Sequence, residues 1–265
     1  METRNIQSPN TSESRKAGDP LELSLCGVKA IFRYCPPGTF IMGSLQNDAI
    51  WDGAVDPHKV KLKRGFWLLE TPVTQALWKA VTGENPSDFQ GMDARPVEKV
   101  SWNDCNDFIC KLNNAEIAPD CMKFAFPTNE EWEYACRAGT KTRYNCGDEL
   151  TESDANFDEI FGVTTPVKSF APNAWGFYDM HGNVCEWCAE RRSDLGSYWD
   201  SYWGFSGFLT PLEYQKAPRS GSLRVLRGGG WLNSAASCRS AALDHNNRSH
   251  KDCNVGFRLA LRTLS

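Results

Sequence analysis

The sequence predicts an α+β fold that is rich in loops. Three observations predict this class: strand-like segments come first, amphipathic helices follow, and the second half is rich in Gly, Asn, Asp, Ser and aromatic residues with few apolar runs. Strands and helices in separate stretches of chain are typical of α+β domains, whereas regular alternation would predict a parallel sheet. The apolar content of 41% over 265 residues is enough to fill a sizeable core.

The first strands are predicted before the first helix. Residues 28–44 alternate in hydrophobicity around a turn at Pro36, Pro37 and Gly38, which predicts strand, turn and strand. Residues 59–69 form a further predicted strand that ends in an apolar run. In the second half, only residues 223–227 and 255–261 have clear strand character.

Three helices are predicted from capping residues and helical periodicity. Thr74 starts a short helix, and Ser101 caps a longer one. Thr128 and Glu131 form a capping box at the start of a third helix, which Gly139 ends. The apolar residues of the second helix share one buried face: Trp102, Cys105, Phe108, Ile109 and Leu112.

One domain over residues 21–265 is the simplest organisation, because no repeat and no linker composition follows residue 20. Residues 1–20 are polar and charged, which predicts a disordered tail. This tail lacks the apolar region of a secretory signal. The chain is expected at the cell surface or outside the cell if a signal segment was removed, and in the cytoplasm otherwise.

The net charge and the lengths of the apolar stretches argue against two classes of partner. A net charge of −4 implies no basic face, so nucleic acid is not an expected partner. No apolar stretch approaches the roughly 18 residues that a membrane span needs.

The cysteines do not form a zinc-finger pattern. Cys185 and Cys188 form a C-x-x-C pair, but no second pair stands at zinc-finger spacing. The eleven cysteines are interpreted as small buried hydrophobic residues with at most one disulfide.

Several short strings occur in a fixed order along the chain. They are residues 37–44 (PGTFIMGS), 70–74 (ETPVT), 96–102 (PVEKVSW), 127–139 (PTNEEWEYACRAG), 172–180 (PNAWGFYDM), 182–187 (GNVCEW), 227–231 (RGGGW) and 256–258 (GFR). Their order and spacing resemble the sulfatase-modifying-factor, or formylglycine-generating-enzyme, family. The resemblance implies a C-type lectin-like fold of the formylglycine-generating-enzyme type, in agreement with the loop-rich second half.

The catalytic metal sites of this family are incomplete in the chain. Its formylglycine-generating members hold copper through two cysteines five residues apart, and the matching positions here are Asn233 and Cys238. Cu(I) prefers two soft thiolates, so an amide and one thiol make a poor copper site. Iron-binding branches use a histidine cluster, and no pair of the four histidines has i, i+4 helical spacing near a Glu: His58, His181, His245 and His250. We therefore expect that the chain is not an enzyme.

The family resemblance also implies one disulfide and one calcium site. The disulfide would join Cys136 to Cys238; the alternative is two buried thiols in contact. The calcium site would use side-chain and backbone oxygens of the 182–187 string, which suit this hard ion. The corresponding residues are Asn183, Val184, Cys185 and Glu186. The alternative is that Asn183 and Glu186 only stabilise a turn.

Residues 230–254 resemble the variable region of proteins diversified by a retroelement. In such systems adenines of a template copy are randomised, mainly in Asn codons of the form AAY. These codons can never become Lys, Glu, Gln, Met or Trp, and the segment contains no Glu, Gln or Met; Trp231 and Lys251 are the exceptions. The alternative is an ordinary polar loop, because Asn, Ser and Asp are common turn formers.

A variable segment predicts a surface of exchangeable side chains on a fixed frame that includes Trp231, Arg239 and Phe257. The candidate ligand-contact residues are Leu232, Asn233, Ser234, Ser237, Ala242, Asp244, His245, Asn246, His250, Asp252 and Asn254. Four further aromatic residues either border this surface or pack in the core: Tyr198, Trp199, Tyr202 and Trp203.

The leading hypothesis is a ligand-binding protein that a retroelement diversifies to recognise variable ligands, with a protein as the expected ligand. It requires no cofactor, and Ca²⁺ is the one ion that the resemblance implies. The alternative is a formylglycine-generating or related metal-dependent oxidase. A third possibility is a structural interaction module that does not vary.

Overall fold

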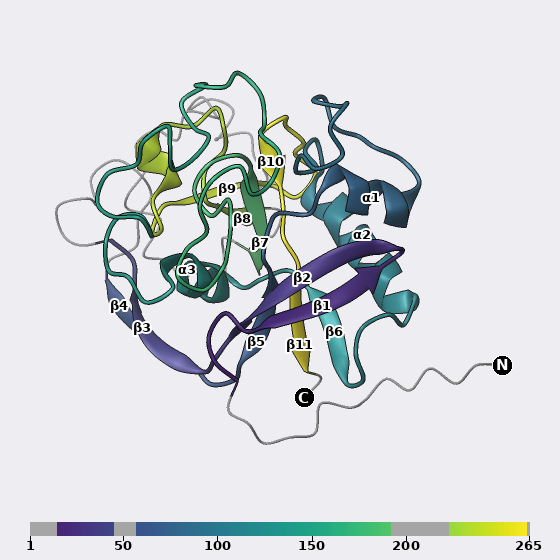
Figure 1. Cartoon of the computed structure of the whole chain (residues 1–265), viewed down its shortest axis with the longest axis horizontal. Helices are drawn as coiled ribbons and strands as arrows, with labels where there is room; N and C mark the ends of the chain where they lie inside the picture. The colour runs from purple at the N-terminus through teal and green to yellow at the C-terminus, as the bar shows by residue number, and fades with distance from the viewer. Residues whose placement is uncertain (1–14, 45–56, 192–222, 264–265) are drawn as a thin grey trace.

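The computed structural model describes residues 15–44, 57–191 and 223–263. A five-stranded sheet of order β1-β2-β5-β11-β6 forms one layer of the molecule (Figure 1). Its strands are β1 (Pro20–Leu25), β2 (Val28–Cys35), β5 (Phe66–Leu69), β6 (Met122–Ala125) and β11 (Ala260–Thr263). All four neighbouring pairs are antiparallel. The sheet brings the last described strand between β5 and β6, so the end of the chain completes the core.

The central strand β5 contributes side chains to two hydrophobic clusters, one on each face of the sheet. All four of its residues are buried, and they alternate between the two faces of the sheet. Trp67 and Leu69 join the cluster that contains Phe257, whereas Phe66 and Leu68 join the cluster around Trp132.

A second, four-stranded sheet of order β10-β7-β8-β9 supports the C-terminal segment. Its strands are β7 (Cys185–Arg191), β8 (Leu223–Arg227), β9 (Leu243–Asn247) and β10 (Val255–Gly256). β9 lies at the edge of this sheet and pairs antiparallel with β8. A separate hairpin pairs β3 (Gly38–Met42) with β4 (His58–Leu62).

The three predicted helices are confirmed as α1 (Gln75–Thr82), α2 (Trp102–Asn114) and α3 (Asn129–Arg137). The Thr128 side chain accepts the Glu131 N–H, and the Glu131 carboxylate accepts the Thr128 N–H, which completes the predicted capping box. α1 and α2 lie together at one side of the five-stranded sheet, whereas α3 lies among the loops of the second half (Figure 1). A short 3₁₀ helix, η3 (Ala235–Cys238), lies within the C-terminal segment.

Several sequence expectations about strands were wrong. Residues 59–69 belong to two strands in different sheets, β4 and β5. Gly65 lies between them and packs closely on Tyr34, since a Cβ there would lie 2.2 Å from Tyr34 Oη. Residues 255–261 are likewise divided between β10 and β11. The tail ends earlier than residue 20, because Gly18 N–H donates to Tyr34 O and Tyr34 N–H donates to Asp19 O. The strands β1, β6, β7 and β9 were not predicted.

No helix in the described ranges is long and apolar enough to cross a membrane.

Buried ion pairs join distant elements of the core. Glu133 of α3 pairs with Arg137 and with Arg227 of β8, and all three side chains are at most 8% exposed. Glu186 of β7 pairs with Arg258, and both are almost fully buried. Each carboxylate is thus neutralised where it is removed from water.

Candidate recognition surface

The C-terminal segment starts at a turn that only glycine can form. Gly228 and Gly229 follow β8 with φ of +86° and +64°. A Cβ on Gly229 would lie 2.6 Å from Cys238 Sγ and 3.0 Å from Ser237 O. The absence of a side chain therefore lets the turn pack directly on η3 and fixes where the rest of the segment begins.

Most of the predicted contact residues reach the surface of this segment. Ser234 is exposed. Seven others are half-buried: Leu232, Asn233, Ser237, Asp244, His245, His250 and Asp252. Side chains that keep part of their surface accessible can contact a partner without leaving the fold.

Three predicted contact residues are buried, so their assignment to a ligand surface was wrong. Ala242 is 4% exposed, Asn246 is 6% exposed and Asn254 is 1% exposed. The Ala242 carbonyl accepts a 2.5 Å hydrogen bond from buried Arg227 Nη1. The Asn254 carbonyl accepts the Cys185 N–H at 2.7 Å, which joins the end of the segment to β7. These residues belong to the frame.

The side-chain amide of Asn233 points into the protein, although part of the residue stays accessible. Its Oδ1 accepts the Gly230 N–H at 2.8 Å and lies 3.4 Å from both Cys185 Sγ and Asn254 Nδ2. The residue at the first cysteine position of the enzymes therefore closes a turn in this chain. A substitution here changes the backbone support as well as the surface.

The predicted frame residues hold the segment from below. Trp231 is 7% exposed, and its indole Nε1 donates to Cys253 O at 3.1 Å. Its ring packs edge-on against Phe89 at 5.4 Å between ring centres. Trp231 N–H also donates to Asn183 O, so the 182–187 string positions the start of the segment. Arg239 and Phe257 are buried, as predicted.

The edge strand β9 presents Asp244 and His245. The Asp244 carboxylate accepts the N–H of His245 at 2.7 Å. Burial raises the pKa of Asp244 to about 6, and this hydrogen bond opposes the rise by stabilising the ionised form. The Asn247 N–H is likewise accepted by the side chain of the residue before it, Asn246, at 2.8 Å.

Sequence reasoning missed the element that borders this surface. Residues 143–159 pack along the segment through a small core of Tyr144, Ala155, Phe157 and Cys238. The Tyr144 hydroxyl donates to Ala235 O at 2.7 Å. The Asp-Glu-Ile-Phe-Gly sequence at 158–162, two acids and two large apolar residues before a glycine, was the available signal for an exposed turn.

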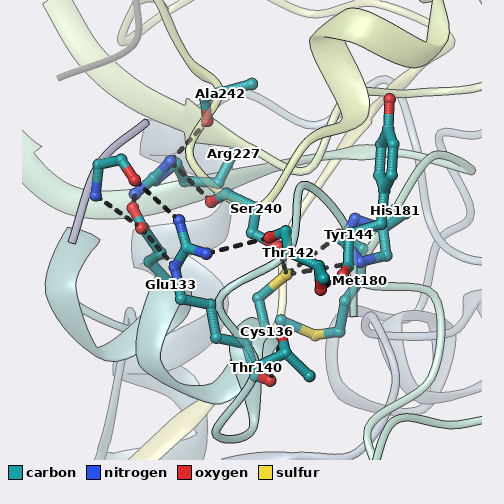
Figure 2. A network of polar contacts seen from close by, with 12 residues as sticks. Glu133, Cys136, Thr140, Thr142, Tyr144, Met180, His181, Arg227, Ser240 and Ala242 are labelled. Carbon is teal, nitrogen blue, oxygen red and sulfur yellow. Dashed lines mark hydrogen bonds and ion pairs between the residues drawn. The ribbon is translucent and has the colours of Figure 1, made fainter. Parts of the chain in front are cut away.

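The predicted Cys136–Cys238 disulfide is not formed, because both cysteines are free and buried. Buried His181 lies beside Cys136 (Figure 2) and also contacts Cys238. Its Nε2 accepts the Asn145 N–H at 3.0 Å, so Nδ1 carries the proton and donates to Cys238 O at 2.7 Å. Cys136 Sγ lies 3.8 Å from Nε2 and 3.5 Å from Ser240 Oγ. The neutral imidazole thus takes the bridging place that a disulfide was expected to fill.

At the predicted calcium site the side-chain oxygens of Asn183 and Glu186 already have partners within the protein. Asn183 Oδ1 accepts the Thr165 N–H, and Asn183 Nδ2 donates to Thr165 O. Both Glu186 oxygens accept from the Arg258 guanidinium, and one also accepts the Trp132 indole N–H. The side-chain oxygens of Asn183 and Glu186 are therefore already used, and the Glu186 charge is neutralised. Val184 and Cys185 are buried beside them in β7 and the turn before it.

The copper chemistry of the enzymes has no thiolate pair in this chain. Cys238 is the one thiol at the two matching positions, and burial raises its pKa to about 12, so it stays protonated at neutral pH. Over the described ranges, no group of three or more His, Cys, Asp or Glu residues could hold a metal ion. The aromatic residues Tyr198, Trp199, Tyr202 and Trp203 lie outside the described residues.

Comparison with known proteins places this geometry in one family. Residues 32–263 match the sulfatase-modifying factor enzyme 1-like domain. The formylglycine-generating enzyme of Thermomonospora curvata is 30% identical over 247 residues, which are 86% of this chain and 69% of that protein. The serine/threonine-protein kinase pkn1 of Chlamydia caviae is 38% identical over 171 residues, 64% of this chain. The match spans only 24% of that kinase.

Solved structures agree with the sequence comparison. Treponema denticola variable protein 1 superimposes with a TM-score of 0.73 at 28% identity, over 92% of this chain and 99% of that one. PvdO from Pseudomonas aeruginosa has the same TM-score at 23% identity, over 94% and 100% of the two chains, and supports the fold alone. The chain therefore belongs to the sulfatase-modifying factor enzyme 1-like, or formylglycine-generating-enzyme, family and has its C-type lectin-like fold.

Proposed function

We propose that the chain is a ligand-binding protein whose segment 230–254 is diversified by a retroelement and contacts a protein ligand. The observation that carries the proposal is the division within this segment between accessible and buried residues. Leu232, Ser234 and Ser237 reach the surface, whereas Trp231 and Cys238, next to them in sequence, are buried. The similarity to Treponema denticola variable protein 1 supports the same function.

This division suits recognition by changing side chains. Buried residues fix the backbone, so substitutions at accessible positions alter the contact surface at little cost in stability. Small polar residues such as Ser234 and Ser237 supply adaptable hydrogen bonds, while larger residues from a diversified codon supply contact area. A protein ligand fits best, because an open surface spread over a strand, a turn and η3 can bury a large interface.

A genomic measurement tests the diversification. We expect a near-copy of the DNA that encodes residues 225–260, with adenines where this gene has other bases, beside a reverse-transcriptase gene. Sequencing this gene in many cells of one culture should then place substitutions at those adenine-derived positions. Substitutions spread evenly over the gene, with no template copy in the genome, would contradict the proposal.

The oxidase alternative has its own test. Because Asn233 replaces one thiolate and Cys238 is held as a thiol, we expect no copper-dependent oxidation of a cysteine-containing peptide by the purified chain. Mass spectrometry of the peptide after incubation with Cu(I) and oxygen measures this directly. Formation of a formylglycine product that a Cys238→Ser substitution abolishes would establish the enzyme instead.

A further inference from the structure

We infer that residues 157–162, here called the border loop, form a fixed part of the recognition surface. The border loop selects protein partners that present basic side chains around an apolar contact. This inference rests on the proposed function and adds the chemical class of the partner. It assigns a role to residues that lie outside segment 230–254 and outside the family strings in the sequence.

The border loop is joined directly to the variable segment by its backbone. Asp158 N–H donates to Asn233 O, and Glu159 N–H donates to Trp231 O, both at 2.8 Å. These two bonds lie on either side of Leu232 in the sequence. Any partner that contacts Leu232 therefore meets the border loop at the same time.

The conformation of the border loop is fixed despite its cost. Asp158 and Glu159 are left-handed, with φ of 52° and 58°, which costs about 1–2 kcal/mol for each non-glycine residue. Phe157 anchors the loop in the small core that it shares with Cys238, and Ile160 N–H closes the turn on Phe157 O at 3.1 Å. Strain that is held by packing and hydrogen bonds is typical of functional loops.

The tip of the border loop exposes two large apolar side chains. Ile160 is 42% exposed and Phe161 is 46% exposed, whereas only two other large hydrophobic residues in the described ranges are exposed to this degree. Phe161 is steadied by an edge-on contact with Phe170 at 6.1 Å. A rigid aromatic beside an aliphatic side chain is a typical anchor at protein interfaces.

The stretch of chain that leads into this apolar tip is negatively charged. Residues 148–159 contain six acidic residues and no Lys or Arg. Five of them are exposed: Asp148, Glu149, Glu152, Asp158 and Glu159. Within the described ranges none of the five forms an ion pair with another residue there, and no three of them converge as metal ligands. Spread, unneutralised charge around an apolar tip complements a basic protein surface and repels nucleic acid.

A display library tests this inference. The accessible positions Leu232, Ser234, Ser237 and His245 are randomised with NNY codons, and the library is selected against native lysozyme, a basic protein, and against lysozyme with succinylated lysines. The two targets differ mainly in charge. We expect about tenfold stronger enrichment of binders on the native target, because like charges oppose the succinylated one.

Two further libraries show which charges act. They carry the same randomised positions on altered versions of the scaffold, here called the border frame and the control frame. In the border frame Glu149→Gln, Glu152→Gln, Asp158→Asn and Glu159→Gln are combined, and the tenfold preference should disappear. In the matched control frame four exposed acids of other regions are neutralised, and the preference should remain: Glu84→Gln, Asp107→Asn, Glu116→Gln and Asp120→Asn. An Ile160→Ser and Phe161→Ser frame should lower enrichment on both targets.

The outcomes separate the inference from the proposed function. Equal enrichment on the two targets in the original frame, or a preference that survives in the border frame, would overturn the inference while leaving a working recognition surface. A library that yields no binder to either target, although its members fold, would overturn the proposed function together with the inference.

Discussion

Polar side chains form different kinds of hydrogen bond in the frame around α3 and in the variable segment. In the frame they join distant elements: Glu133 pairs with Arg227, 94 residues away, and Glu186 with Arg258, 72 residues away. In segment 230–254 the carboxylates form local contacts, whereas Lys251 pairs with Asp104 of α2. The carboxylate of Asp244 accepts the next N–H along the chain at 2.7 Å, and that of Asp252 accepts the Cys253 N–H at 2.7 Å and lies 3.8 Å from His250 Nε2.

Side chains with local partners can change more easily than those that join distant elements. Removing a frame carboxylate leaves a charged partner buried without compensation, whereas removing a side chain that bonds only the next residue disturbs one turn. The proposed diversification of segment 230–254 needs both kinds of region in one fold.

The Glu133→Gln substitution should have the largest effect. It leaves the guanidinium groups of Arg137 and Arg227 buried and unpaired, so we expect a loss of about 3–5 kcal/mol in the free energy of unfolding. Urea unfolding followed by circular dichroism measures this loss. The exposed Glu149→Gln variant is the control and should change stability by less than about 0.5 kcal/mol. Equal effects of the two variants would contradict the comparison.

His181 should contribute a pH-dependent part of the stability. Burial lowers its pKa from the ordinary value of 6.5 to about 4, so the unfolded chain binds the extra proton more readily. The sign follows from this: the contribution is complete above pH 6.5 and is lost as the pH falls toward 4, a loss of roughly 3 kcal/mol.

The total stability profile does not isolate His181, because raised carboxyl pKa values act in the opposite direction. Burial raises the pKa of Asp179 to about 6 and that of Glu190 to about 7, and such groups stabilise the fold as the pH falls. An NMR titration of the labelled His181 ring isolates the group. We expect its midpoint below pH 5; a midpoint above 6 would show that the imidazole is not held neutral between Cys136 and Cys238.

Two glycines with similar φ distinguish packing from backbone strain. Gly229→Ala adds a Cβ 2.6 Å from Cys238 Sγ at a φ of +64°, and we expect a loss of about 2–3 kcal/mol. Gly83→Ala has a φ of +89° with no atom within 4 Å, so it should lose about 1 kcal/mol from backbone strain alone. Thermal unfolding of both variants is the measurement. A smaller loss at Gly229 would mean that the turn does not lie against η3.

Accessible positions of the variable segment should show the smallest effects. Ser234→Asn, Ser237→Asn and Asp252→Asn should each change the free energy of unfolding by less than about 0.5 kcal/mol, because none removes a long-range contact. Urea unfolding of the single variants and of the triple variant checks both size and additivity. Losses above about 2 kcal/mol at these sites would place them in the frame.

Local signals explain which parts of the fold the sequence could predict. Thr128 and Glu131 cap each other within one turn, so the start of α3 is readable without knowledge of the rest of the chain. β9 depends on pairing with β8, and its polar sequence has no alternating pattern, so it was missed. β1 was missed although Leu21, Leu23 and Leu25 alternate, because strands were predicted only from residue 28 onward.

The sequence proposes a site at the level of the segment and cannot assign each residue to the surface or the core. The amino-acid composition and the flanking strings delimit residues 230–254 as the candidate segment, yet they hold no information on which way a side chain faces. Asn254 is buried because its carbonyl meets Cys185 N–H across 69 residues of chain, a contact that no local spacing reveals. The border loop was missed for the same reason, since only tertiary packing places Asp158 beside Asn233.

Saturation substitution of residues 230–254 with a folding readout measures which positions of the segment tolerate change. Each variant is displayed on cells and scored by resistance to protease, which reports the folded fraction. We predict that Leu232, Ser234, Ser237 and His245 accept most residues that NNY codons encode, while Trp231, Cys238 and Asn254 accept few. Equal intolerance along the whole segment would show that its side chains serve the core, and would contradict a recognition surface on a fixed frame.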